Sequence, residues 1–310
     1  MDIQCIGNLT ADLFLTDGEE FELPIGPVTL LDDAQLHPGG TAANTGQDLA
    51  RLGVPVVIHT RIGGDAAGDM LLNRMRASGA QVVAHRDTSA GTTLTLYRRH
   101  TDGHSSFAYF PGTSAVFSEE DVDLALLSSA HYVHVGGTFL LPSFDGEPCA
   151  RLLQRARESG SITSLDPTPN ITSESLEILS PCLPHLSVFL PNLEQAQQLS
   201  GYETTGDVAA FFLERGVDTV VLKMDRQGCY VRSHDVEMVV PAYRVEEVDS
   251  TGAGDAFVAG FLTGLHKGWD LKRSAELANA VGAMCVSCVG SVDGVGSLKS
   301  TTQFMKRRGS

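Results

Sequence analysis

Short runs rich in valine and isoleucine alternate with longer helix-like stretches through most of the chain, and no other feature limits the possible folds as strongly. Helices that alternate with strands are typical of a parallel sheet that helices cover. The pattern therefore predicts an α/β fold, a three-layer αβα sandwich around a mostly parallel, Rossmann-like sheet. The strands are expected at Ile3–Gly7, Val56–Thr60, Val82–Ala84, Tyr132–Val135, Ile162–Leu165, Val188–Leu190 and Thr219–Leu222. The helices are expected near Ala42–Leu52, Ala66–Ser78, Glu119–Leu127, Pro148–Ser159, Leu193–Leu199, Val208–Arg215, Gly254–His266 and Leu271–Cys288.

Two segments, at about 13–37 and 92–110, interrupt this alternation. The first contains no convincing helix, and in the second Thr92–Arg99 alternates like a half-exposed strand and is followed by Ser105–Phe110. They are expected to form a small separate β-sheet inserted into one domain that spans residues 1–310. Open α/β sheets bind ligands at the carboxyl edge, where both segments emerge, so the small sheet is interpreted as a lid. The alternative is two surface excursions without a function.

Charge and composition exclude several classes of partner. The formal net charge is −16, from 22 basic and 38 acidic residues, which disfavours nucleic acid because phosphate backbones are bound by clustered lysine and arginine. The segment Met1–Gly7 lacks the features of a signal peptide, and no apolar run approaches the ~18 residues that a membrane helix needs. A cytoplasmic protein that binds no membrane is expected.

The segment Val248–Phe257 carries the strongest chemical signal. It places small residues where a helix begins, and Gly252 and Gly254 remove the Cβ atoms that would keep an anion away from the backbone. Backbone N–H groups and the positive end of the helix dipole then favour a bound phosphate. This arrangement would stabilise the charge that develops on a transferred phosphoryl group.

Asp255 lies in this segment and is poorly suited to binding phosphate, because a carboxylate repels an anion beside it. A carboxylate in the first helical turn is well placed to remove the proton from an attacking hydroxyl group. The alternative is an aspartate that caps the helix beside a tight turn. The residues leave both possibilities open.

The motif Asp249–Asp255 resembles the C-terminal signature of the ribokinase-like (PfkB) carbohydrate kinases. The resemblance implies that Gly252, Ala253 and Gly254 form an anion hole and that Asp255 is the catalytic base. It also implies a reaction that uses ATP and Mg²⁺. By analogy it suggests a monovalent cation such as K⁺ near Asp249 and Gly290, and a homodimer formed through the lid.

The segment Pro38–Asn44 is similar to the first signature of the same family, a Gly-Gly pair followed by asparagine at the start of a helix. The resemblance implies that Gly39, Gly40 and Asn44 bind the sugar, together with Asp12, which follows the first strand. Paired glycines allow close approach of a polyol, and Asn44 offers both a donor and an acceptor. An ordinary helix cap and a solvated loop aspartate are the alternatives.

The resemblance also assigns residues to the nucleotide. Asn192 and Glu194 lie in a segment similar to the family's Asn-x-x-Glu element, which helps to place Mg²⁺ through water, but Gln195 stands where glutamate is expected. Glu194 is offered as a substitute ligand, although adjacent helical residues point about 100° apart.

The turn Lys223–Gly228 occupies the place of the family's nucleotide-contacting turn, with Asp225 where glycine is usual. Lys223 and Gly228 are assigned to this contact, and Asn279 matches a position beside the adenine. A solvated lysine at the end of a strand is the alternative for Lys223.

The expected function is transfer of the γ-phosphoryl group of ATP to a hydroxyl group of a sugar or sugar derivative. A nucleoside kinase of the same fold is the nearest alternative, and a non-catalytic sugar-binding module is a further one. A dinucleotide-dependent oxidoreductase is disfavoured because the turn Gly7–Asp12 lacks Gly-x-Gly-x-x-Gly.

Overall fold

The computed structural model describes residues 3–16, 33–99, 105–288, 290 and 292–308. Its main sheet has nine strands in the order β13-β12-β11-β10-β9-β8-β1-β4-β5. The strands from β5 to β11 pair in parallel, and β12 and β13 extend this sheet as antiparallel strands at one edge. The bounds are β1 Ile3–Gly7, β4 Val56–Gly63, β5 Gln81–Asp87, β8 Tyr132–Thr138, β9 Ile162–Pro167, β10 Val188–Phe189, β11 Thr219–Lys223, β12 Cys229–Ser233 and β13 Glu237–Val240.

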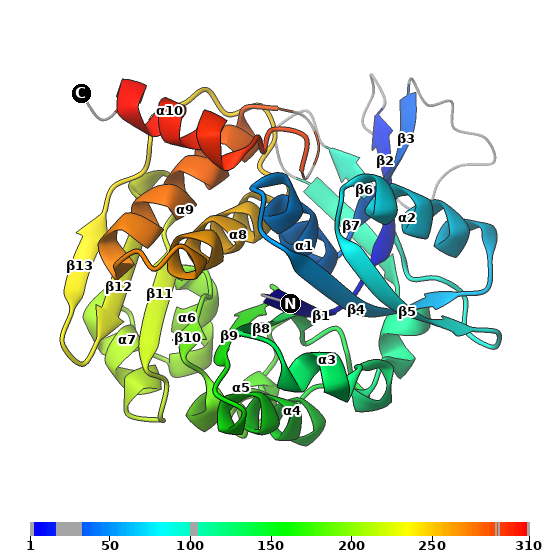
Figure 1. The fold of residues 1–310 in the computed structure, drawn as a ribbon, viewed down its shortest axis with the longest axis horizontal. Helices are drawn as coiled ribbons and strands as arrows, with labels where there is room; N and C mark the ends of the chain where they lie inside the picture. Colours follow the sequence, from blue (N-terminus) through cyan, green and yellow to red (C-terminus); the bar gives the residue numbers. More distant parts are fainter. Residues whose placement is uncertain (1–2, 17–32, 100–104, 289, 291, 309–310) are drawn as a thin grey trace.

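Helices cover both faces of this sheet because its strands are apolar on both faces. In β11, Val221 packs into one core cluster, whereas its neighbours Val220 and Leu222 pack into the other, as the alternation of side chains along a strand requires. Figure 1 shows α1, α8 and α9 on one side and α3, α4 and α5 on the other. The helices are α1 Thr41–Arg51, α2 Ala66–Ala77, α3 Leu124–Ser128, α4 Glu147–Glu158, α5 Ser175–Leu179, α6 Leu193–Ser200, α7 Thr205–Leu213, α8 Ala253–His266, α9 Leu271–Val286 and α10 Leu298–Arg308.

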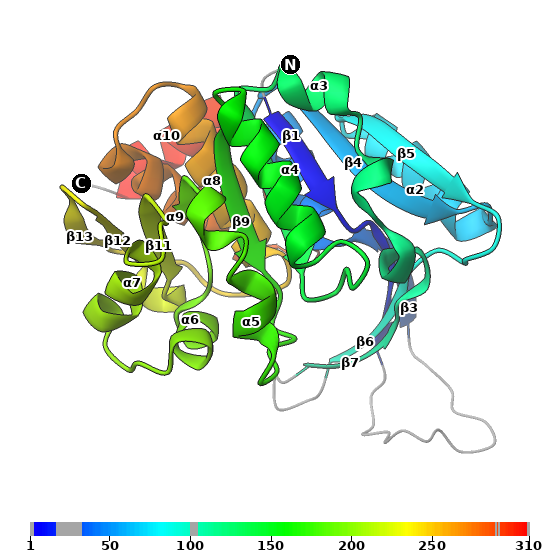
Figure 2. The same ribbon diagram turned by 90° about the horizontal axis from the view of Figure 1, so that it is seen from below.

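A second sheet of four strands stands apart from the main one, in the order β3-β2-β6-β7. Figure 2 shows β3, β6 and β7 extending away from the main sheet. These two sheets confirm the fold class expected from the sequence. The bounds are β2 Thr10–Thr16, β3 Asp33–Gly39, β6 Leu94–Arg99 and β7 Ser105–Phe110. The proposed lid segments 13–37 and 92–110 fall partly on residues 17–32 and 100–104, which lie outside the described residues.

One expected element is wrong. The segment Glu119–Leu127 does not form a single helix: a 3₁₀ turn spans Glu119–Asp121, and α3 begins only at Leu124. Val122 between them is extended, and the Asp123 carboxylate caps α3 by accepting hydrogen bonds from the amides of Ala125 and Leu126. An aspartate that can cap a helix thus starts a new one.

Other elements were not anticipated from the sequence. They are the antiparallel strands β12 and β13, the short helix α5 and the helix α10. Within the described part of the chain, no helix is both long and apolar enough to cross a membrane.

Candidate active site

The glycine-rich turn ahead of α8 is held in place by a buried carboxylate. Asp249 accepts hydrogen bonds from the amide of Thr251 at 3.0 Å and from the amide of Gly290 at 3.0 Å. Gly252 has φ 78°, a left-handed conformation that favours glycine, and α8 begins at the next residue. The turn therefore presents the N-terminus of α8 in one conformation.

Asp255 lies in the first turn of α8, and α1 reaches it from the other end of the sequence. The Nδ2 group of Asn44 donates a hydrogen bond to Oδ2 of Asp255 at 2.9 Å. Burial raises the pKa of Asp255 to about 7, and the charge of Asp166 adds to this rise, whereas the Asn44 hydrogen bond and the charge of Lys223 oppose it. A carboxylate with this pKa suits a general base at neutral pH.

Lys223 forms a buried ion pair with Asp166, with Nζ at 2.8 and 2.7 Å from the two carboxylate oxygens. A Cβ atom built on Gly254 would lie 3.3 Å from this Nζ, so the ammonium group borders the glycine-rich turn. The sequence analysis missed Asp166. Its position at the carboxyl end of β9, where ligands bind in open α/β sheets, was the available signal.

Asp12 lies on β2, and its carboxylate packs against Gly39 of the neighbouring strand β3, the glycine that pairs with Thr10. The hydroxyl of Thr10 donates to the Asp12 carboxylate at 2.6 Å. A Cβ atom on Gly39 would lie only 1.8 Å from Asp12 Oδ2, and one on Gly40 would lie 2.6 Å from the carbonyl oxygen of Asn8. Burial raises the pKa of Asp12 to about 6. The Gly-Gly pair thus makes room for this carboxylate and for the entry into α1.

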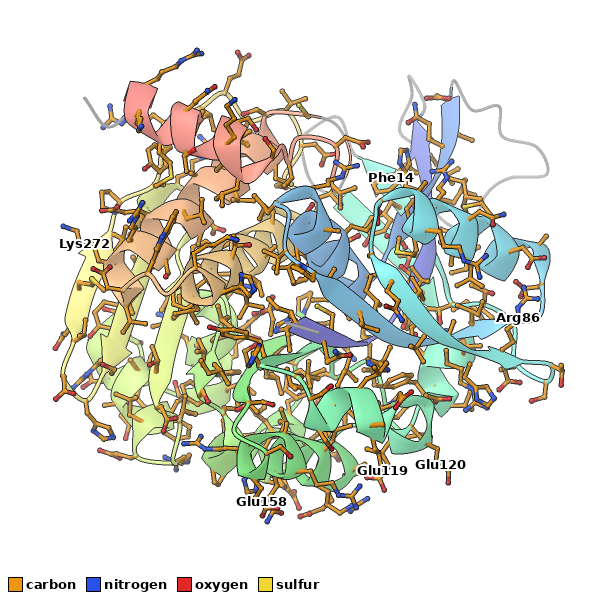
Figure 3. All side chains as sticks on the ribbon, in the orientation of Figure 1. Phe14, Arg86, Glu119, Glu120, Glu158 and Lys272 are labelled. Carbon is orange, nitrogen blue, oxygen red and sulfur yellow. The ribbon has the colours of Figure 1, made fainter. Side chains whose placement is uncertain are left out.

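Aromatic side chains share the Asp12 face of the small sheet. Across the strands Asp12 pairs with Thr95 and Thr95 with Tyr109, while Phe14 pairs with Tyr97. The rings of Phe14 and Tyr97 stack at 4.8 Å with an interplanar angle of 7°. Figure 3 places Phe14 beside the strands of the small sheet.

Tyr97, on the same face, is influenced electrostatically by both Asp12 and Asp255. Burial raises its pKa, and the charges of Asp12 and Asp255 raise it further. The sequence analysis missed these aromatic residues. The two-residue period of β2 and β6 was the signal that could have found them.

The residues assigned to Mg²⁺ contribute mainly to the start of α6. Gln195 Oε1 accepts a hydrogen bond from the Asn192 amide at 2.8 Å, and Gln195 Nε2 donates to the Pro167 carbonyl at 3.3 Å. Glu194 is exposed and lies 3.4 Å from Gln198. Among the described residues no three His, Cys, Asp or Glu side chains form a metal cluster. Nucleotide phosphates and water can supply most of the oxygen ligands of Mg²⁺.

The remaining nucleotide-assigned residues surround the turn between β11 and β12. Gly228 has φ 99°, and a Cβ atom there would lie 2.0 Å from the Val240 carbonyl oxygen. Asn279 donates to the carbonyls of Val240 at 3.0 Å and Pro241 at 3.2 Å. Both residues thus hold the end of β13 close to this turn. Their role at a nucleotide stays a prediction.

The structure brings Asn44, Asp166, Lys223, Gly254 and Asp255 together at the carboxyl edge of the sheet. Comparison with known proteins identifies the family of the chain. Residues 2–296 match the pfkB family of carbohydrate kinases. The chain belongs to this family.

Individual pfkB relatives agree with this assignment. The aminoimidazole riboside kinase of Salmonella typhimurium is 30% identical over 82% of this chain and 83% of its own length. The ribokinase of Staphylococcus aureus is 26% identical over 96% and 97%. A putative ribokinase II from E. coli superimposes with a TM-score of 0.86 in its apo form, at 26% identity and 99% coverage of both chains. Its complex with ATP and Mg²⁺ superimposes with a TM-score of 0.85, at 25% identity and the same coverage.

Proposed function

We propose that this pfkB carbohydrate kinase transfers the γ-phosphoryl group of ATP to a hydroxyl group of a sugar or sugar derivative, with Asp255 as the base. The observation that carries the proposal is the position of the Asp255 carboxylate. It lies at the N-terminus of α8, is hydrogen-bonded to Asn44 and adjoins a turn whose Gly254 borders the Lys223 ammonium. The E. coli relative that binds ATP and Mg²⁺ supports the choice of phosphoryl donor.

In the proposed reaction, the acceptor hydroxyl is held by Asp12 and Asn44 near Asp255. Its proton passes to the Asp255 carboxylate while its oxygen forms a bond to the γ-phosphorus, and the bond to the β,γ-bridging oxygen breaks to release ADP. Backbone N–H groups at 252–254 and the Lys223 ammonium stabilise charge on the transferring phosphoryl oxygens. Asn192 and Glu194 would hold Mg²⁺ through water, and the ion would supply further neutralisation of the phosphates. A role for K⁺ beside Asp249 stays a prediction.

The stacked pair Phe14–Tyr97 favours a nucleoside as the second candidate acceptor. Flat aromatic faces can pack against the nucleobase of a nucleoside as well as against the apolar side of a sugar ring. The similarity to an aminoimidazole riboside kinase supports the same candidate. A non-catalytic sugar-binding protein is not favoured, since the carboxylate and glycines needed for transfer are all in place.

We also propose that the small sheet joins two copies of the chain. Its face opposite Asp12 carries Leu13, Leu96 and Ala108 in one cross-strand row, and Phe110 is 52% exposed. A second copy would cover this apolar row and the sheet edges. Light scattering after size exclusion should give a molecular mass twice that of one chain. The Leu96→Lys variant should have the mass of a single chain. Cytoplasmic location stays a prediction.

The proposal is tested by ADP release with Mg²⁺ and ATP on a panel that contains ribose, fructose, 2-dehydro-3-deoxygluconate, inosine and adenosine. Asp255→Asn should lower kcat at least ~10²-fold on the best acceptor, because a positioned base contributes about that much. ATP affinity should remain. Asp235→Asn is the matched control, since Asp235 is exposed and remote from the site. Unchanged turnover in Asp255→Asn would remove that residue from the mechanism.

A further inference from the structure

Two cysteines, Cys285 and Cys288, lie three residues apart at the end of α9, the helix that packs along α8 (Figure 1). All six cysteines of the chain lie in described residues, and Cys288 alone among them is exposed, whereas Cys285 is buried. The amide of Cys288 donates to the Cys285 carbonyl at 3.2 Å, so one turn of chain joins the pair. An exposed thiol can react with an oxidant in solution, and a second thiol nearby can then complete a disulfide.

Cys285 contacts the glycine-rich turn ahead of α8. Its Sγ donates a hydrogen bond to the Thr251 carbonyl at 3.6 Å. Burial raises the pKa of the Cys285 thiol, and the charges of Asp48, Asp255 and Asp249 raise it further. The thiol is therefore covered by the same turn that leads into the proposed base.

The chain around the two cysteines holds this turn at further points. The Val286 carbonyl accepts hydrogen bonds from the amides of Val248 at 2.7 Å and Asp249 at 3.2 Å. The Gly290 amide donates to the Asp249 carboxylate at 3.0 Å. The segment that ends in Thr251 is thus attached to the end of α9 through backbone and side-chain contacts, and a movement of this end would displace it.

A disulfide between the two cysteines requires such a movement. Cβ atoms three residues apart on a helix are about 5–6 Å from each other, whereas those of a disulfide are about 3.5–4.5 Å apart. A Cβ atom on Gly294 would lie 2.9 Å from the Cα atom of Cys285, so a neighbouring loop restricts the backbone of Cys285. Cys288 is therefore the residue that has to move, by roughly 1–2 Å, and the chain that leads to Gly290 moves with it.

We propose that Cys285 and Cys288 form a reversible disulfide that lowers the activity of the enzyme. The disulfide withdraws the Cys285 thiol from the Thr251 carbonyl and shifts the end of α9, so the glycine-rich turn loses the contacts that fix its conformation. The regulatory effect rests on the proposed function of this turn in phosphoryl transfer, whereas formation of the disulfide does not.

The oxidant in this proposal is a low-molecular-weight disulfide, RSSR. The Cys288 thiolate attacks one sulfur of RSSR, forms a mixed disulfide and releases one RS⁻. Cys285 then gives up its proton to solvent, and its sulfur attacks the Cys288 sulfur and displaces the second RS⁻. In sum, two protein thiols and RSSR become one protein disulfide and two RSH, so the cysteines are oxidised and RSSR is reduced. The burial of Cys285 makes the second step the slower one.

The first test detects the bond itself in the full chain. The protein is incubated with oxidised glutathione, its remaining thiols are alkylated, and its peptides are analysed by mass spectrometry without reduction. The peptide that contains both cysteines should be two hydrogen atoms lighter than its reduced form and should carry neither glutathione nor the alkyl group. Cys288→Ser should form no such bond. A mixed disulfide that persists at Cys288, or a disulfide between two chains, would overturn the proposal.

Cys182→Ser is the matched control for the other neighbouring thiols. Cys182 is buried and contacts Cys149, and its thiol donates to the Gly146 carbonyl at 3.5 Å, a bond that a serine hydroxyl can also make. This variant should form the disulfide between Cys285 and Cys288 as the unsubstituted protein does. A variant that no longer responds to oxidised glutathione would assign the response to the wrong pair and overturn the proposal.

The second test measures the effect on turnover. ADP release by the oxidised protein with its best acceptor should fall at least about tenfold, because displacement of a positioning group by about 1 Å can cost more than this. Dithiothreitol should restore the rate, and Cys288→Ser should keep its turnover in oxidised glutathione. Cys285→Ser lets glutathione add to Cys288 but cannot form the disulfide, so its turnover should also persist. Loss of turnover in Cys285→Ser would show that the adduct itself inhibits, which would overturn the proposal.

Affinity for a fluorescent ATP analogue separates this proposal from the proposed function. Oxidation should weaken binding of the analogue several-fold in the unsubstituted protein and not in Cys288→Ser. This result would support the switch even if no acceptor were phosphorylated, and the absent turnover would then count against the proposed function. A disulfide that forms completely but leaves analogue affinity and turnover unchanged would overturn the switch and leave the proposed function intact.

Discussion

The two ends of the site are built in different ways. The proposed phosphate end is a continuous segment, Gly252–Asp255, in which backbone N–H groups and a helix N-terminus would do most of the binding. The proposed acceptor end is assembled from β2, the start of α1 and the rest of the small sheet. Its contacts come mainly from side chains such as Asp12, Asn44 and Tyr97.

This difference explains what each end can specify. A phosphate group is the same in every reaction of a kinase family, and backbone groups bind it without depending on side-chain identity. Acceptors differ in shape and hydroxyl positions, and side chains on separate segments can change independently. We therefore expect substitutions to affect the two ends through different kinetic constants.

The largest effect is expected from Gly39→Ala at the acceptor end. The new Cβ atom would lie 1.8 Å from the Asp12 carboxylate, so this side chain must leave its position. The acceptor kcat/KM should fall at least ~10²-fold, the loss expected when a charged hydrogen-bonding group is displaced. Affinity for a fluorescent ATP analogue should stay unchanged, which also reports that the variant is folded. An unchanged acceptor KM would contradict this account of Gly39.

Gly254→Ala is the matched substitution at the phosphate end and should have a smaller effect. Its Cβ atom would meet only the tip of Lys223, at 3.3 Å, and a flexible side chain can move by a few tenths of an ångström. We expect kcat to fall about tenfold because the ammonium shifts from the transferring group, with the acceptor affinity retained. Steady-state kinetics with each substrate varied measures both. A rise in the acceptor KM of Gly254→Ala with unchanged kcat would contradict the proposed separation of a phosphate end from an acceptor end.

The sequence reveals more of the proposed phosphate end than of the proposed acceptor end, for a physical reason. The motif Asp249–Asp255 is continuous, so its glycines and carboxylate are visible together in one segment. Phe14 and Tyr97 lie near Asp12, and Asp166 lies near Lys223, but these residues are on strands far apart in the chain. Only the pairing of strands brings them near Asp12 and Lys223, and a single sequence does not determine that pairing.

The fold, too, could be predicted from the sequence only in part. The alternation of strands and helices was enough to predict the parallel sheet, because each buried strand is a distinct apolar run. The antiparallel strands β12 and β13 are less apolar, with Arg232 and Glu237 in their register, and they escaped notice. The break at Val122 also depends on a local cap at Asp123 that competes with continuation of a helix.

Buried carboxylates should also affect stability. Asp255 has its pKa raised to about 7 in the folded protein, so the folded state binds its proton more tightly than the unfolded chain does. The contribution of Asp255 to the free energy of unfolding therefore falls as the pH rises from about 4 to 7, because the folded state must then ionise this buried carboxyl group. Asp255→Asn should then be more stable by about 1 kcal/mol at pH 8, and the gain should shrink at pH 5. Urea unfolding at both pH values checks it, and lower stability of the variant at pH 8 would contradict the electrostatic account.

The smallest expected effect is on the pH dependence of the acceptor kcat/KM, because Asp255 lies at the phosphate end and is hydrogen-bonded to Asn44 of the acceptor end. The acceptor kcat/KM should rise with pH through about 7 and then level off, because the base acts when ionised. Asn44 belongs to the acceptor end, and its hydrogen bond lowers the pKa of Asp255. Asn44→Ala should therefore move the acidic limb of the profile to higher pH, in addition to raising the acceptor KM. Asn192→Ala, which alters the start of α6 instead, should leave the limb in place. An acidic limb that does not move in Asn44→Ala would show that the acceptor end binds the sugar without tuning the base.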